Sequence, residues 1–138
     1  MERLRTLLSR VDLMRVKNQK SRRIVELLEA EPMFYQRTGY SAAQLEVFKT
    51  AERQSKTIKV DINEYATKLE NLRSSIVNGL ENNYTSTQID TILPQLLIAE
   101  KGIQERLVAS QEMISQTLEV VNILRAKRGA DPILESQI

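Results

Sequence analysis

The stretch FKTAERQSKTIKVDINEYATKLENLRSSI, residues 48–76, decides the fold of this chain. Apolar or small residues return along it in alternating steps of three and four: Phe48, Ala51, Ser55, Ile58, Ile62, Tyr65, Leu69, Leu72 and Ile76. This spacing places them on one stripe of an α-helix. A repeat sustained over about four heptads is typical of a coiled coil or a long bundle helix.

The sequence also marks the two ends of this helix. Ser41 and Gln44 fit a capping box, in which the Ser hydroxyl and the Gln side chain each accept from a backbone N–H at the helix start. The apolar repeat fades at Gly79, and residues 82–86 read as a polar turn. We therefore predict a helix over residues 41–81.

A second helix is predicted over residues 2–31, ended by Pro32 because a proline disfavours helical backbone in the residue before it. Its apolar seam contains two polar residues, Asn18 and Ser21, which we expect to mark a place where the seam opens to water. The alternative is that a buried Asn fixes the helix register. The apolar seam positions are Leu4, Leu7, Val11, Met14, Val25 and Leu28.

A third helix is predicted over residues 87–128. Pro94 lies near its start, so the regular helix begins close to Pro94 or kinks there. Gly129 is the expected C-terminal cap. Apolar residues beside the seam, such as Leu97 and Ala99, widen the apolar stripe, so this helix is expected to touch more than one neighbour. The seam is Ile89, Leu93, Leu96, Ile103, Leu107, Ile114, Val121 and Leu124, interrupted by Glu100, Ser110 and Thr117.

The expected fold is all-α: an elongated antiparallel helical hairpin or three-helix bundle with coiled-coil character. We expect one helical domain over residues 1–129, followed by a flexible C-terminal tail over 130–138. The alternative is that the first helix projects and pairs with another chain, so the sequence leaves open whether the helices pair within or between chains.

The composition restricts the chemistry that is available. The chain has no Cys and no His, so thiolate metal sites, thiol nucleophiles and imidazole bases are all missing. Glu100 is the one acid on an apolar seam, and we interpret it as a gap in packing rather than a catalytic acid. No enzyme activity, cofactor or metal is expected. The lack of Cys, of a long apolar run and of a signal-peptide pattern favours an intracellular protein, cytoplasmic or nuclear.

Positive charge is concentrated at the N-terminus. The formal net charge is +2, yet residues 1–23 hold eight basic and two acidic groups, a balance of +6. Arg3, Arg10 and Lys17 line one edge of the first seam, and Arg15 and Arg22 line the other. The other two helices offer few acidic flanking groups in return, so the first helix is expected to bind an acidic partner. The alternative is that these side chains extend into solvent around a seam within the chain.

The connector 32–40 is a second expected contact surface. It holds three aromatic residues, which either cap the bundle or anchor a partner. The predicted partner-binding residues are Arg3, Leu7, Arg10, Val11, Met14, Arg15, Lys17, Arg22, Met33, Phe34 and Tyr35.

These features favour a non-enzymatic helical interaction protein, such as a scaffold, an adaptor or an assembly chaperone of a larger complex. Its partner would present an acidic-flanked helix or groove, and the chain is expected to form a homo- or hetero-oligomer. The main alternative is a nucleic-acid-associated protein that uses the basic first helix, although no aromatic residue is interleaved there for base stacking. A membrane-surface helix is a further alternative, without a membrane span.

Overall fold

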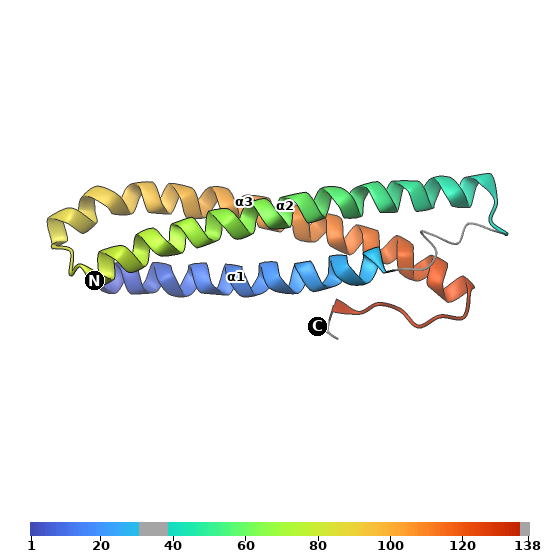
Figure 1. Ribbon diagram of the computed structural model, residues 1–138, viewed down its shortest axis with the longest axis horizontal. Coiled ribbons are helices and arrows are strands. Elements are labelled where there is room, and N and C mark those ends of the chain that lie inside the picture. Colours follow the sequence, from blue (N-terminus) through green and yellow to red (C-terminus); the bar gives the residue numbers. More distant parts are fainter. Residues whose placement is uncertain (31–38, 136–138) are drawn as a thin grey trace. The chain divides into compact units, whose positions relative to one another are not determined.

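The computed structural model describes residues 1–30 and 39–135, and these ranges contain no β-strand. The helices are α1 (Glu2–Glu29), α2 (Ala42–Glu81) and α3 (Ser86–Lys127), of 28, 40 and 42 residues (Figure 1). The predicted all-α class is confirmed. Each end that can be compared lies within two residues of its predicted position.

The helices contribute to two compact units, each built from one segment of every helix. Unit 1 comprises Met1–Gln19 and Asn63–Val108, and unit 2 comprises Lys20–Ile62 and Ala109–Ile138. Both units are therefore three-helix bundles. That the chain acts as one domain over residues 1–129 stays a prediction.

The core of unit 1 is formed by the predicted seams. Each helix contributes aliphatic side chains at steps of three and four, so one stripe of each helix faces inward. Burial of these stripes removes apolar area from water, which is the main driving force for the bundle. The buried residues are Leu4, Leu7, Val11, Met14, Tyr65, Leu69, Leu72, Ile76, Ile89, Ile103 and Leu107.

The core of unit 2 follows the same rule and adds one aromatic contact. Tyr40, just before α2, packs edge-to-face on Phe48 with ring centroids 4.7 Å apart, an arrangement that aromatic pairs prefer. The buried residues are Ile24, Val25, Leu28, Phe48, Ala51, Ile58, Ile62, Ile114, Leu118, Val121, Leu124 and Ile133.

Capping hydrogen bonds explain where α2 and α3 begin. The predicted capping box is confirmed: the Ser41 N–H donates to Gln44 Oε1 at 2.9 Å, and the Gln44 N–H donates to Ser41 Oγ at 3.2 Å. Thr85 and Gln88 form a second box that starts α3, with distances of 2.8 and 3.2 Å. The sequence analysis missed this second box, although Thr-x-x-Gln has the same spacing.

Gly129 is the C-terminal cap of α3, as predicted. Its φ of 74° is left-handed, and the N–H groups of Gly129 and Ala130 donate to the carbonyls of Ala126 and Arg125. This is the Schellman pattern, which satisfies carbonyls that the end of a helix leaves without partners. Pro94 lies inside α3, which already begins at Ser86. Pro94 has no N–H to donate to the Asp90 carbonyl, so the helix passes through it with one hydrogen bond fewer.

The expectation that the first seam opens to water at its polar pair is wrong. Asn18 and Ser21 are only 4% and 6% exposed. The seams of α2 and α3 also bury hydroxyls, so these positions are polar sites within packed surfaces. The other buried polar residues are Ser55, Ser110 and Thr117.

The predictions for the connector and for the C-terminal tail can be compared with the structure only in part. Met33, Phe34 and Tyr35 lie outside the described residues. Of the expected flexible tail, residues 130–135 are described. Within them, Ile133 is buried in the unit 2 core, and both of its backbone polar groups bond to Asn122.

Candidate functional site

The basic edge formed by Arg3 and Arg10 faces carboxylates of α3. Arg3 pairs with Asp90, and Arg10 binds Glu100 through two hydrogen bonds of 2.7 and 3.1 Å. The Glu100 side chain is 13% exposed and that of Arg10 is 48% exposed. Hydrogen bonding to Glu100 raises the pKa of Arg10 above its ordinary value, so the guanidinium keeps its positive charge.

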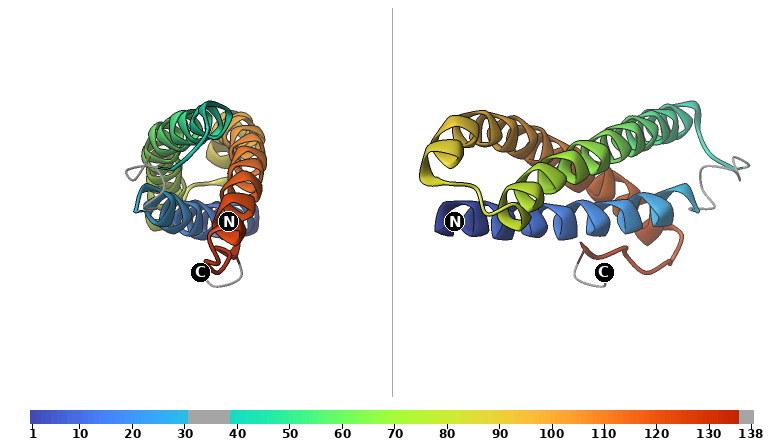
Figure 2. Two further views of the ribbon diagram at one scale, coloured as in Figure 1. Left: turned by 90° about the vertical axis from the view of Figure 1, so that its right-hand side faces the viewer. Right: turned by 60° about the vertical axis from the view of Figure 1, so that its left-hand side comes forward.

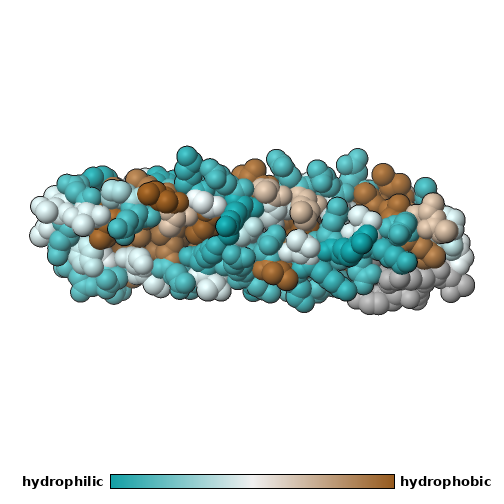
Figure 3. All heavy atoms as spheres, turned by 90° about the horizontal axis from the view of Figure 1, so that it is seen from above, coloured by the Kyte–Doolittle hydropathy of each residue, from teal (hydrophilic) through white to brown (hydrophobic). Residues whose placement is uncertain are grey.

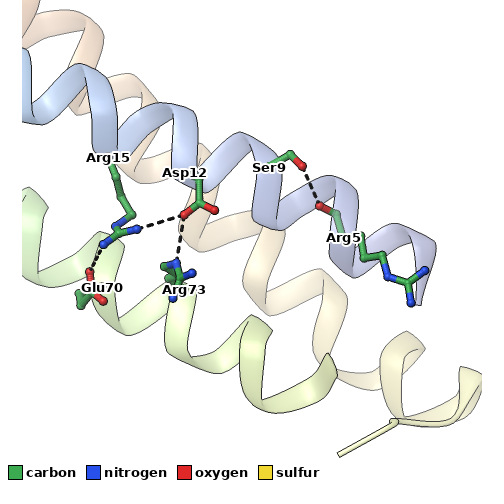
Figure 4. A network of polar contacts seen from close by, with 6 residues as sticks. All are labelled: Arg5, Ser9, Asp12, Arg15, Glu70 and Arg73. Atoms are coloured by element: carbon green, nitrogen blue, oxygen red, sulfur yellow. Dashed lines mark hydrogen bonds and ion pairs between the residues drawn. The ribbon is translucent and has the colours of Figure 1, made fainter. Parts of the chain in front are cut away.

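The opposite edge of α1 is paired with α2 (Figure 4). Asp12 Oδ1 accepts from Arg15 at 3.2 Å and from Arg73 Nε at 3.0 Å, and Arg15 also reaches Glu70 at 3.0 Å. Within unit 1, the α1 segment is therefore antiparallel to α2. It is parallel to α3, because Arg3 and Arg10 meet Asp90 and Glu100 in the same order.

The expectation that the other two helices offer few acidic groups to the first helix is therefore wrong. Arg3, Arg10 and Arg15 each meet a carboxylate of their own chain. The physical reason lies at Glu100. It occupies a seam position of α3, and a seam side chain points at a neighbouring helix rather than at solvent. The same pairs leave fewer cations for nucleic-acid phosphates, which weakens that alternative.

The predicted apolar contact residues of α1 are also occupied by unit 1. Leu7 and Val11 are fully buried and Met14 is 5% exposed, so these side chains present no free surface to a partner in this arrangement. Lys17 and Arg22 are exposed, and their role in binding a partner stays a prediction.

A groove of about 480 Å³ lies between α2 and α3 of unit 1, and the sequence analysis did not single it out. We call it the α2–α3 groove. Its residues follow helical spacing on both walls, so it runs along the two helices. They are Lys68, Asn71, Leu72 and Ser75 of α2, and Leu96, Ile98, Ala99, Gly102, Ile103 and Arg106 of α3.

The groove is largely apolar. Leu72 and Ile103 belong to the buried core and reach it from below, while Ile98 is 73% exposed. The adjacent Leu97 is 39% exposed. On the face drawn in Figure 3, apolar side chains likewise reach the surface in patches among hydrophilic ones. A concave apolar surface with few polar groups is the usual form of a binding site.

Gly102 deepens the groove without serving the packing of its own chain. It lies in the middle of α3, and a Cβ at this position would meet no atom within 4 Å. Glycine in a helix interior costs about 0.5–1 kcal/mol relative to alanine. Gly79 of α2 differs, because its Cβ would lie 3.1 Å from Leu4 Cδ1. The bare backbone at Gly102 therefore has no internal explanation, and it would let a partner approach α3 closely.

The rim of the groove carries an excess of positive charge. Glu64 Oε1 lies 2.9 Å from Lys68 Nζ and 3.3 Å from Arg106 Nη1. The hydrogen bond from Lys68, its charge and the nearby Arg106 hold the pKa of Glu64 below its ordinary value. The carboxylate is thus ionised at neutral pH, and two cations face one anion. Such a rim complements an acidic partner.

The groove left one signal in the sequence. The apolar stripe of the third helix is wider than one partner requires, and Leu97 and Ala99 were part of that excess. Spacing alone could not show that this excess borders a groove, because that depends on how closely α2 approaches.

In the ranges 1–30 and 39–135, no three acidic, His or Cys side chains gather as they would around a metal ion. None of the described helices is long and apolar enough to cross a membrane. The chain matches no protein-family model, and no curated protein or solved structure shows significant similarity to it.

Proposed function

We propose that this protein is a non-enzymatic helical interaction subunit, a scaffold, adaptor or assembly chaperone, that binds a partner helix in the α2–α3 groove. The observation that carries the proposal is the groove itself, with Ile98 exposed beside the bare backbone of Gly102. Contiguous apolar surface rimmed by polar residues is typical of an interaction site.

The dimensions and charges of the groove describe its partner. From Leu96 to Arg106 the α3 wall rises by about 15 Å, or roughly three helical turns. Amphipathic helices bind such grooves through apolar residues at steps of three and four. Lys68 and Arg106 favour a helix with acidic residues beside its apolar stripe. The acidic partner predicted from the sequence is thus retained, at a different surface.

The test compares two substitutions of the same kind. Ile98→Glu places a carboxylate in the groove, and Val60→Glu places one at an equally open apolar position of unit 2, where Val60 is 65% exposed. Both sites are exposed in helices, so neither change should unfold the protein. Affinity purification from the source cells, with quantitative mass spectrometry, would compare the two variants with the unchanged protein.

The expected result is that Ile98→Glu loses at least one partner by tenfold or more, whereas Val60→Glu keeps it. The retained partner should then contain a helix that cross-links to residues of the groove. Identical partner sets for all three proteins, with unchanged helicity by circular dichroism, would refute the assignment of the groove.

A further inference from the structure

In unit 2 the C-terminal segment turns back after the end of α3 (Figure 2). Side chains from one face of α3 hold it. Arg125 Nε donates to the Asp131 carbonyl at 2.6 Å, and Ser115 Oγ donates to Glu135 Oε1 at 3.1 Å. Between them, Asn122 bonds to Ile133. The partners move backward along α3 as the segment moves forward, so the segment is antiparallel to the helix.

Asn122 recognises backbone rather than side chain. Its Oδ1 accepts from the Ile133 N–H at 2.8 Å, and its Nδ2 donates to the Ile133 carbonyl at 2.9 Å. An amide that takes both groups of one residue holds an extended chain whatever its sequence. The selectivity comes from the Ile133 side chain, which is 9% exposed and joins the unit 2 core.

The segment has the properties of an extended peptide ligand. Its contacts with α3 fall on residues 131, 133 and 135. Residues 131–134 lie outside any helix, and Glu135 has 3₁₀-helical backbone. Pro132 has no N–H to leave without a partner, and it favours extended backbone at Asp131. Leu134, between two contact positions, is 44% exposed. The recognised pattern is therefore a proline, a buried aliphatic residue, any residue and a glutamate.

The end of α3 does not depend on this segment beyond Ala130. Gly129 and Ala130 complete the Schellman cap by themselves. One buried side chain and a few hydrogen bonds hold residues 131–135, and Ser115 and Glu135 are both exposed. Local opening of a segment with so few contacts is the kind of motion that requires least free energy.

We propose that Ser115, Asn122 and Arg125, the α3 tail site, bind an extended Pro-aliphatic-x-Glu segment of a partner protein, and that the chain's own tail occupies this site in the free protein. The partner must displace the tail, so the tail acts as a built-in competitor. This proposal is independent of the α2–α3 groove, which lies in the other unit.

The experiment uses the full-length chain and a fluorescent peptide of residues 129–138, GADPILESQI. Ile133→Asp in the chain should release the tail, because a carboxylate cannot enter the apolar core. The peptide should then bind this variant at least tenfold more tightly than it binds the unchanged chain. Adding Asn122→Ala should abolish that binding, and a peptide that itself carries Ile133→Asp should not bind.

Two further measurements keep the proposal testable. If Ile133→Asp unfolds the chain, excess peptide added to the unchanged chain must accelerate hydrogen exchange at the Ile133 amide, and no acceleration at millimolar peptide overturns the proposal. No gain in peptide binding by a folded Ile133→Asp chain also overturns it. Sedimentation should show a monomer; a dimer that is lost with Ile133→Asp would instead assign the site to the tail of a second copy.

Discussion

Gly102→Ala should stabilise this protein, and the structure sets the size of the effect. Alanine is better than glycine in a helix interior by about 0.8–1.0 kcal/mol. Nothing lies within 4 Å of the added Cβ, so no packing cost offsets the gain. With an unfolding entropy of about 2.1 cal/mol/K per residue, the Tm should rise by about 3 °C if all 138 residues unfold together. If unit 1 alone unfolds in that transition, the rise should be about twice as large.

Two other glycines provide controls, because the same substitution meets a different obstacle at each. At Gly79 the new Cβ would lie 3.1 Å from Leu4 Cδ1 and 3.3 Å from Tyr84 Cδ2, so crowding should cancel or reverse the gain. At Gly129 the φ of 74° penalises any Cβ, and the Tm should fall by the equivalent of about 1–2 kcal/mol.

Differential scanning calorimetry on the three variants would measure these shifts. The order should be Gly102→Ala above the unchanged protein, Gly79→Ala at or below it, and Gly129→Ala clearly below it. A lower Tm for Gly102→Ala would mean that the α2–α3 groove is not open at Gly102, and the assignment of the groove would then fail. Since Gly102 lines that groove, a larger side chain there, Gly102→Leu, should keep the fold and still weaken partner binding.

Three further predictions concern buried hydroxyls and ion pairs. Ser55 and Ser110 have buried hydroxyls with no hydrogen-bond partner among the described residues, so Ser→Ala at either site should raise the free energy of unfolding in urea by about 1 kcal/mol. Thr117 is the control, since its hydroxyl bonds to the Met113 carbonyl and to Gln54, and Thr117→Val should lower that free energy instead. Arg10→Gln should lower the free energy of unfolding by about 1 kcal/mol, after allowance for the half-exposed guanidinium. Adding Glu100→Gln should restore part of this loss. If the effects of the two substitutions simply add, the pairing of Arg10 with Glu100 is contradicted. The pKa of Glu64 is lowered by Lys68. The contribution of Glu64 to stability is therefore present above the ordinary carboxyl pKa and is lost as the pH falls through the lowered value. In an NMR titration, Lys68→Gln should raise the pKa of Glu64, and an unchanged titration curve would exclude the contact.

The sequence predicted the helices well because helix formation and its amphipathic pattern are local. A stripe of residues such as Leu4, Leu7 and Val11 must face a neighbour wherever the helix lies. The helix ends were predictable for the same reason, since Ser41 and Gly129 act within one turn.

The pairing of charges was not predictable in the same way. Whether Arg10 meets Glu100 depends on the register of α1 against α3, and periodicity does not contain that register. The sequence marked Glu100 only as a break in an apolar seam. It became interpretable once the structure placed Arg10 opposite it.

Surfaces formed after packing were harder still. The α2–α3 groove is what remains when two helices have buried their seams, and the Asn122 contact with Ile133 joins a helix to a segment with no periodic pattern. Gly102 was visible in the sequence, but a glycine within a predicted helix does not indicate a groove until the atoms around it are known.

Exposure alone would not have selected the groove. Leu13 and Val60 are 61% and 65% exposed, and single apolar side chains of this kind are common on protein surfaces. Ile98 differs because it borders a hollow with Leu72 and Ile103 at its base and Gly102 at its side. A helix that fills this hollow would bury Ile98 and pack against the other groove residues, whereas a contact at Val60 would cover one side chain. The binding energy available to a partner is therefore greater at the groove than at Val60. For this reason Ile98→Glu should abolish binding of a partner that Val60→Glu still binds.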